Sequence, residues 1–442
     1  MEKRKKFRWR HLAMFFPALI AMIAYMDRSN IAVASIQIMP EFHITLVEFG
    51  VISSIFFWTY IVMQIPGGIL VERYGPRKVL TGAFGWWSAF TLLTIAGFNY
   101  ISFLIIRGLF GLGEGPLYPS SANLFSRWLK KDEMSTASAW LQAGTWLGPI
   151  FSTILSVWIM ITWGWRWIFI IYGIIGSIIA IGYYALMRDM PEESKYVSKE
   201  EIEEINASYA EPEKERGKTI KKFAPWKKLL KNGRFWAFGF THGAIDLVLY
   251  GLLTMLPLYL YEARHIKLSA IPVFGVAPWV AGIIGVLFFG YYLDSRIKKG
   301  ATLRNTFAIP SGIGLIIAGI LFMLGGLAPS AVISIVLIML AMFAVTPHGA
   351  TAFSIEARIG HEYSGSYTSW LNFWGNVFGS FSPMLISVIA TTVSWAAALA
   401  TIGVMVIILG SLWFVVNPDK SFVPEVIPSY IPMKMVMKEA GD

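Results

Sequence analysis

Long apolar stretches without any charged side chain dominate the chain. Asp, Glu, Lys and Arg are all absent from 79–106, 134–165, 268–293, 305–355 and 363–418. One bilayer crossing needs about 20 apolar residues, so the two longest stretches each predict a pair of helices joined by a turn. A transmembrane β-barrel is excluded, because its strands alternate apolar and polar positions.

The pattern predicts an all-α membrane protein with twelve transmembrane helices in two six-helix bundles. The bundles cover 1–187 and 234–418, with a cytoplasmic linker at 188–233 that is partly helical over 198–208 and a cytoplasmic tail at 419–442. The predicted spans are 12–36, 47–71, 79–99, 101–124, 136–160, 167–187, 234–261, 271–293, 304–325, 329–353, 365–391 and 395–417.

Basic residues sort by the side of this predicted membrane. With the N-terminus inside, the cytoplasmic segments hold 32 of the 37 Lys and Arg residues, and the outer loops hold three. Cytoplasmic loops favour positive charge, so we expect a multi-pass protein of the plasma (inner) membrane with both termini in the cytoplasm. The position of the basic residues on the cytoplasmic side of a lipid bilayer therefore explains the net charge of +10 better than a nucleic-acid partner does.

Composition argues against an enzyme. Hydrophobic residues make up 56% of the chain and charged residues 14%, and there is no cysteine, which removes thiol nucleophiles and thiolate metal sites. The H-E-x-x-H and G-x-S-x-G motifs of metalloproteases and serine hydrolases are missing as well. We expect no catalytic residue, no metal and no cofactor.

A charged pattern recurs after the second and the eighth predicted span. Gly68-x-x-x-Glu72-Arg73-x-Gly75-Pro76-Arg77-Lys78 is followed 222 residues later by Gly290-x-x-x-Asp294-x-Arg296-x-Lys298-Lys299. The preference of cytoplasmic loops for basic residues explains the Lys and Arg, but not the repeated spacing from glycine to acid. We expect two internal repeats with gating residues at Gly68, Glu72, Arg73, Arg77, Asp294 and Arg296.

These motifs resemble the major facilitator superfamily over residues 12–417. Its signature loop between spans two and three has this layout, and Arg107-x-x-x-Gly111-x-Gly113-x-Gly115 is similar to its motif in span four. Glu72 and Ser295 stand where the superfamily pattern usually has Asp and Arg. Four further segments together resemble the anion:cation symporter family: YMDRSNIAVA at 25–34, GLGEGPLYPS at 111–120, GWRWIF at 164–169 and RDMPEESKYVSKEE at 188–201.

The resemblance implies a monomeric carrier of a small organic anion. The family includes importers of hexuronates, aldonates, phthalate and nicotinate, and the sialin-like lysosomal carriers. In such carriers the coupling ion is the proton, so we expect H⁺ as the coupling ion here.

Seven ionisable side chains fall well inside the predicted spans. Each costs a few kcal/mol at the centre of a bilayer unless it is paired or hydrated, which makes each a functional candidate. They are Asp27, Arg28, Arg107, Glu114, His242, Asp246 and His348.

Arg28 is the candidate anchor for a substrate carboxylate, because its planar guanidinium matches the two carboxylate oxygens. Asp27 and Glu114 are the candidate proton-coupling residues, since burial disfavours a charged carboxylate. The resemblance assigns the same roles to the matching residues. Two alternatives stay open: a structural role for Glu114 in helix packing, and a buried ion pair of Asp27 with Arg107 or of Arg28 with Glu114.

Polar residues in other spans complete the candidate site. Hydroxyl and amide groups suit a hydroxylated or carboxylated solute, although hydrogen bonds between helices would use the same groups. His242 and Asp246 lie four residues apart on one helix face, as an auxiliary polar pair or as a pair bonded only to each other. The candidate substrate-binding residues are Arg28, Tyr60, Gln142, Asn372, His348 and Thr351.

We therefore expect a secondary active transporter in which two bundles rock about a midplane site. Protons on Asp27 and Glu114 and a substrate carboxylate on Arg28 would precede the rocking step, because neutral acids lower the cost of closing the site. An anion exchanger, or an exporter of drugs or other solutes with the same fold, is the alternative.

Overall fold

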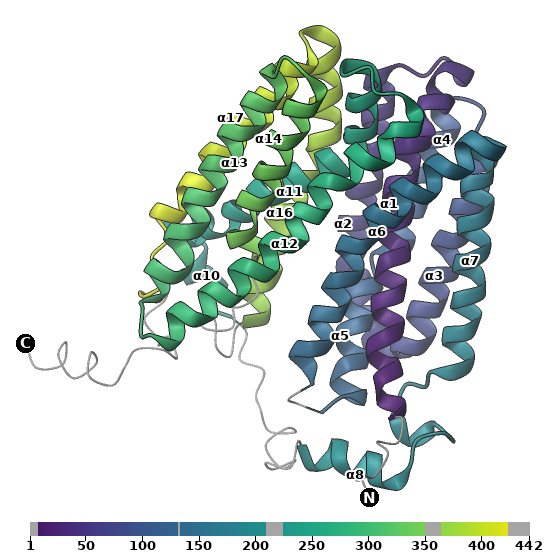
Figure 1. Ribbon diagram of the computed structural model, residues 1–442. Coiled ribbons are helices and arrows are strands. Elements are labelled where there is room, and N and C mark those ends of the chain that lie inside the picture. Colours follow the sequence, from purple (N-terminus) through teal and green to yellow (C-terminus); the bar gives the residue numbers. More distant parts are fainter. Residues whose placement is uncertain (1–7, 131–132, 209–223, 350–363, 423–442) are drawn as a thin grey trace, which may run out of the picture. The chain divides into compact units, whose positions relative to one another are not determined.

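The computed structural model of the chain describes residues 8–130, 133–208, 224–349 and 364–422. All regular secondary structure in these residues is helical, as the apolar pattern predicts (Figure 1). The chain divides into two compact units, Met1–Thr219 and Ile220–Asp442. This division falls inside the predicted linker.

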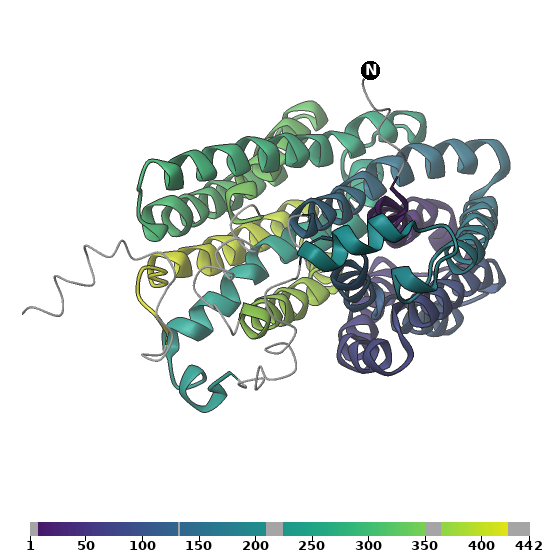
Figure 2. The ribbon, with the colours of Figure 1, turned by 90° about the horizontal axis from the view of Figure 1, so that it is seen from below.

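The N-terminal unit is a bundle of long helices, coloured purple to teal in Figure 1 and seen from below in Figure 2. Polar residues cap two of them: Thr45 accepts the backbone N–H of Glu48 at 3.2 Å, and Asn99 accepts that of Ser102 at 2.9 Å. The helices are α1 (Leu12–Phe42), α2 (Leu46–Tyr74), α3 (Pro76–Leu93), α4 (Tyr100–Glu114), α5 (Leu117–Trp128), α6 (Met134–Trp163), α7 (Trp165–Leu186) and α8 (Lys199–Ser208).

The C-terminal unit is a second bundle, in which α11 is packed against α16 and α13 against α17. The final span continues from α17 into a short 3₁₀ turn, Leu412–Phe414. The helices are α10 (Trp226–Leu229), α11 (Gly233–Leu258), α12 (Ile271–Lys298), α13 (Ile309–Leu327), α14 (Ala331–Ala344), α16 (Ser364–Thr392) and α17 (Trp395–Ser411).

Eleven helices in the described residues are long and apolar enough to cross a membrane, and they match eleven of the twelve predicted spans. The remaining predicted span, 101–124, is not one continuous helix, because the structure divides it into α4 and α5 at Gly115 and Pro116. Proline lacks the N–H that would continue the helix, and its ring clashes with the carbonyl four residues earlier. The interruption makes Glu114 the last residue of α4.

Large apolar side chains are exposed along the long helices. Ile181 on α7 is 70% exposed, and Leu287 on α12 is 69% exposed. Exposing so large an apolar surface to water is unfavourable, whereas the tails of membrane lipids would cover it.

Glycines let the helices that carry the candidate residues approach closely. A Cβ on Gly144 of α6 would lie 2.2 Å from the carbonyl oxygen of Ala18 on α1. A Cβ on Gly111 of α4 would lie 2.3 Å from the carbonyl oxygen of Phe56 on α2. Only small residues allow such approach between membrane helices, so α1 meets α6, and α2 meets α4, at these positions.

Helix α8 of the predicted linker docks onto the start of the chain. Glu201 accepts the backbone N–H of Arg10 at 2.9 Å. Glu204 pairs with Arg8 and Arg10, and the Arg10 guanidinium also bonds Glu133 at the start of α6. We refer to these five residues as the α8 clasp, because together they tie the linker helix to the N-terminal bundle.

Candidate functional site

Arg28 of α1 and Glu114 of α4 form a buried ion pair in the N-terminal unit. Nε of Arg28 lies 2.6 Å from Oε2 of Glu114, and the two side chains are 1% and 0% exposed. The sequence analysis selected Arg28 and Glu114 for separate roles and left an ion pair between them open as an alternative. The structure shows this ion pair. Burying two charges is costly, and only close approach and further favourable contacts offset that cost.

Three aromatic rings surround the guanidinium of Arg28. Its Cζ lies 4.5 Å from the ring centroid of Tyr25, 5.1 Å from that of Phe56 and 4.7 Å from that of Tyr60. Ring faces attract a cation within about 6 Å. We call these three residues the aromatic box, because they hold the guanidinium beside Glu114.

Sequence reasoning selected Tyr60 but missed Tyr25 and Phe56. The spacing of these rings could have identified them, because Tyr25 precedes Arg28 by three residues and Phe56 precedes Tyr60 by four. Residues three or four apart share one helix face. A search for aromatic residues at these spacings would have found both rings.

Asp27 lies beside Arg28 in sequence but has different neighbours. Its side chain is 1% exposed, and Oδ1 accepts a hydrogen bond from Asn30 at 3.2 Å. Arg107 reaches Asp27 through the backbone, with Nη1 3.4 Å from the carbonyl oxygen. Oδ2 is buried without a hydrogen-bond partner among the described residues, so a proton on this oxygen would displace no hydrogen bond.

The structure does not test the predicted substrate-binding roles of Gln142 and Thr351. Gln142 is half-buried on α6, with Oε1 3.5 Å from the Thr145 hydroxyl. Thr351 lies outside the described residues. Both therefore stay predictions.

His348 and His242 meet in the C-terminal unit. Nε2 of His348 lies 3.0 Å from Nδ1 of His242, and Trp413 donates its indole N–H to Nδ1 of His348 at 3.0 Å. His348 and Trp413 are fully buried, whereas His242 is half-buried. Both ring nitrogens of His348 are thus engaged, and sequence reasoning missed Trp413.

Asp246 and Asn372 lie on the two helices that flank this cluster. A Cβ on Gly375 of α16 would lie 2.3 Å from Cδ2 of His242 and 2.5 Å from Oδ2 of Asp246, so both α11 side chains meet α16 at one point. Asn376, one turn after the exposed Asn372, donates to its side-chain oxygen.

The predicted gating residues of the N-terminal unit lie at the junction of α2 and α3. Nothing lies within 4 Å of a Cβ placed on Gly68, and Glu72 and Arg73 are exposed. Arg77 donates to the Tyr184 carbonyl at 2.7 and 3.0 Å. The gating role of these residues stays a prediction, because their location alone does not test it.

An acid from the linker, Asp189, caps the start of α3 by accepting the backbone N–H of Arg77 at 2.9 Å. Gly75 precedes this cap with φ of 83°, a conformation that glycine adopts readily. In the C-terminal unit Arg296 is exposed at the end of α12, and the side chain of Asp294 lies outside the described part of the chain.

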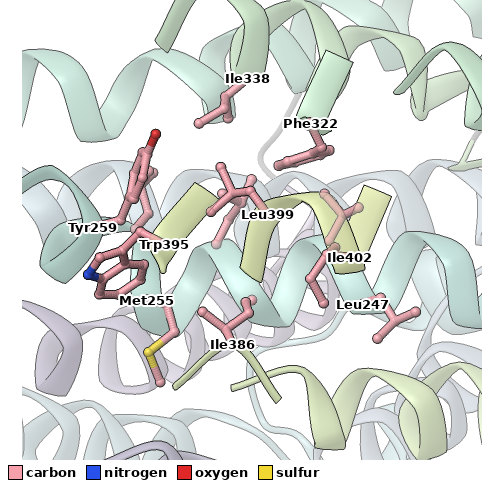
Figure 3. A pocket seen from close by; sticks show the side chains of 13 residues that line it. Leu247, Met255, Tyr259, Phe322, Ile338, Ile386, Trp395, Leu399 and Ile402 are labelled. Carbon is pink, nitrogen blue, oxygen red and sulfur yellow. The ribbon is translucent and has the colours of Figure 1, made fainter. Parts of the chain in front are cut away.

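A separate crevice in the C-terminal unit is apolar (Figure 3). Leu247, Met255, Phe322, Trp395 and Ile402 are among the side chains that line it, and none of its lining residues is charged. Without a charged partner this crevice does not suit an anion. The polar clusters therefore remain the candidate site.

A buried ion pair and a histidine cluster inside apolar helical bundles are typical of a membrane transporter. The model of the Major Facilitator Superfamily matches residues 18–383. The chain belongs to this superfamily, and it is an integral multi-pass membrane transporter rather than an enzyme. The solved structure of a bacterial homolog of the human lysosomal transporter Spinster has the same fold, with a TM-score of 0.77, 16% sequence identity and coverage of 94% of this chain and 98% of that chain.

Several curated relatives are similar over most of their length. The "Probable sulfoacetate transporter SauU" of Cupriavidus necator is 28% identical, with 86% of this chain and 87% of the relative covered. The "Probable galactarate/D-glucarate transporter GarP" of Escherichia coli is 27% identical, with 91% and 93% covered. A "D-galactonate transporter" of Escherichia coli is 27% identical, with 92% and 95% covered.

Proposed function

We propose that the chain carries a small organic anion, a sugar acid or another carboxylate, together with protons across the plasma (inner) membrane. The relatives are described as transporters of sulfoacetate, galactarate, D-glucarate and D-galactonate, which are all small organic anions. A membrane protein with buried arginines such as Arg28 and Arg107 inside its helical bundle suits an anionic cargo. We propose further that it works as a monomer with both termini in the cytoplasm.

The ion pair of Arg28 with Glu114, inside the aromatic box, is the observation that carries the proposal. An arginine in an apolar span is costly, and its fork of N–H groups matches a carboxylate. Here a carboxylate of the protein itself lies 2.6 Å away. Glu114 therefore occupies the position that a carboxylate of the cargo would take on Arg28.

This competition gives a coupling mechanism. While Glu114 is ionised, it holds Arg28 and excludes the cargo. A proton on Glu114 weakens its hold on the guanidinium, and the cargo carboxylate then replaces it with the net charge of the site unchanged. Binding of the anion and of the proton thus favour one another, as linkage requires.

Asp27 is the proposed second proton-coupling residue. Its Oδ2 is buried without a hydrogen-bond partner in the described structure, and the carbonyl of the same residue contacts Arg107. A neutral Asp27 would lower the cost of closing the site around the cargo. Tyr60, Gln142, Asn372 and Thr351 are proposed to bind the rest of the cargo.

The transport cycle is proposed to follow alternating access, in which Gly68, Glu72, Arg73, Arg77, Asp294 and Arg296 act at the cytoplasmic gate. An exposed acid such as Glu72 can favour one state only if its contacts differ between the two states.

Uptake by purified protein in liposomes tests the proposal. Radiolabelled D-galactonate, D-glucarate and sulfoacetate are offered with and without an inward proton gradient. We expect saturable uptake of at least one anion, accumulated against its gradient only when protons flow inward. Uptake that needs anion on the opposite side and ignores the pH gradient would identify an exchanger instead, and failure to move any of the three would refute the proposed cargo.

A further inference from the structure

The C-terminal unit contains a buried relay of three rings that the proposed proton coupling does not use. Trp413 donates to Nδ1 of His348 at 3.0 Å, and Nε2 of His348 lies 3.0 Å from Nδ1 of His242. The first two rings are fully buried and the third is half-buried. The relay therefore leads from the interior of the bundle to a partly exposed imidazole.

The direction of the hydrogen bonds in this relay is determined by chemistry. An indole N–H can only donate, so Nδ1 of His348 accepts and carries no proton. A neutral His348 then has its proton on Nε2, which donates to Nδ1 of His242. His242 in turn carries its own proton on Nε2, and the relay ends in an N–H donor.

An acceptor, Asp246, lies about one turn further along the same helix. Oδ2 of Asp246 and Cδ2 of His242, the carbon bonded to Nε2, both lie against Gly375 of α16. A carboxylate has about four lone-pair positions, so Asp246 can accept a further hydrogen bond in addition to those it already makes. The face of α11 at this point thus pairs one donor with one acceptor.

A second relay in the same unit also ends in a donor. Tyr250 donates to Oδ1 of Asn376 at 2.8 Å, and Nδ2 of Asn376 donates to Oδ1 of Asn372. The side-chain oxygen of the exposed Asn372 is used as an acceptor, so its NH₂ group is the donor that this relay offers. Two separately oriented donors indicate an oxygen-rich ligand.

We propose that His242 and Asp246 form a subsite for a hydroxyl group of the transported anion. A hydroxyl donates and accepts at once, which matches an N–H beside a carboxylate, whereas a second carboxylate would be repelled by Asp246. His348 and Trp413 are positioning residues that keep the His242 proton on Nε2. This inference rests on the proposed function, because it concerns the cargo of that transporter.

The subsite makes hydroxylated acids better cargo than plain carboxylates of the same length. A site built to hydrogen-bond a hydroxyl leaves polar groups unpaired when the hydroxyl is missing, and it discriminates strongly against such analogues. In this inference both nitrogens of His348 are used by Trp413 and His242, so His348 acts on the cargo through His242 rather than directly.

The test compares D-galactonate with hexanoate, which has six carbons and one carboxylate but no hydroxyl, as cargo of the full chain in liposomes. We expect a lower KM for D-galactonate in the unaltered protein. His242→Phe should raise that KM by roughly tenfold or more while leaving the KM for hexanoate unchanged, since one hydrogen bond is lost. His242→Gln, whose amide keeps a donor near Nε2, should restore most of the preference.

Trp413→Phe tests the positioning role, because it keeps a ring but removes the indole N–H. We expect a raised KM for D-galactonate, little change in kcat, and a change of tautomer at His348 in ¹⁵N spectra of histidine-labelled protein. Size-exclusion profiles and melting temperatures identify variants that fail to fold, and His242→Gln remains informative if His242→Phe is one of them.

Two results would overturn the inference: equal KM values for both acids in the unaltered protein, or an unchanged preference in His242→Phe. Failure of the proposed function looks different, since no anion would then be transported at all. In that case the ¹⁵N spectra still decide about the relay, and a His242 protonated on Nδ1 would refute it.

Discussion

Arg28 and Glu114 meet at 2.6 Å although 86 residues separate them in the chain. Glu114 ends α4, and the break at Gly115 and Pro116 follows directly. Removing one partner of a buried ion pair typically costs about 3–5 kcal/mol, because the other charge is left alone. Loss of either partner should therefore destabilise the N-terminal unit.

Arg28→Lys should reduce uptake by orders of magnitude while the protein still folds. Lysine keeps the positive charge but offers a point charge in place of two parallel N–H groups. Initial uptake rates in liposomes measure the effect, with Arg304→Lys as the matched control, since Arg304 is exposed and belongs to neither the proposed site nor the proposed gate. Near-normal transport by Arg28→Lys would remove Arg28 from the binding site.

Glu114→Gln and Asp27→Asn should both abolish uphill, proton-driven uptake. An amide resembles a permanently protonated acid, so the proton can no longer leave. In Glu114→Gln the carboxylate that competes for Arg28 is gone, and we expect anion binding to be kept or strengthened.

Accumulation under an imposed pH gradient and anion-for-anion exchange are the two measurements for these variants. Exchange should survive in at least one of them. The coupling scheme is wrong if both still concentrate the anion when the gradient is imposed.

Gly375→Ala should destabilise the C-terminal unit by about 1–3 kcal/mol, the usual cost of overpacking. The new Cβ would overlap the side chains of His242 and Asp246. Gly290→Ala on α12 is the control, because nothing lies within 4 Å of its Cβ position. Melting temperatures of the purified variants measure the difference, and equal values for both would show that the α11–α16 contact is loose.

Docking of α8 should depend on acidic pH through Glu204. The hydrogen bond from Arg10 holds the pKa of the Glu204 carboxyl below its ordinary value of 4.5. Because the Glu204 carboxyl has a lower pKa when α8 is docked, its ionised form stabilises docking at pH values above the ordinary pKa. This contribution is lost as the pH falls through the lowered pKa.

Hydrogen-exchange protection of α8, corrected for intrinsic rates, measures this dependence. We expect constant protection from neutral pH down to about 5 and a decline below the ordinary pKa. Glu204→Gln should be less protected at neutral pH and lose the decline, whereas Glu203→Gln, at an exposed position on the same helix, should behave like the unaltered chain. If protection of α8 in Glu204→Gln still declines at acidic pH, a titratable group other than Glu204 causes the decline.

The sequence by itself determined the helices and their environment. Eleven of the twelve predicted spans are apolar helices in the structure, and the predicted linker helix is present as Lys199–Ser208. These features follow from local pattern, because a bilayer requires about 20 consecutive apolar residues and a helix satisfies its own backbone. The break after Glu114 was visible as Gly115 and Pro116, but their effect on the span was not anticipated.

Only the tertiary structure decided which polar groups meet. Asp27 adjoins Arg28 in sequence, yet neighbours on a helix point about 100° apart, and the carboxylate at Arg28 comes from Glu114. The aromatic box and the bond between His348 and His242 likewise join different helices. Such contacts depend on how closely two helices approach and on how each is rotated about its axis. Gly111 and Gly375 allow close approach because they lack a Cβ that would overlap atoms of a helix far away in the chain.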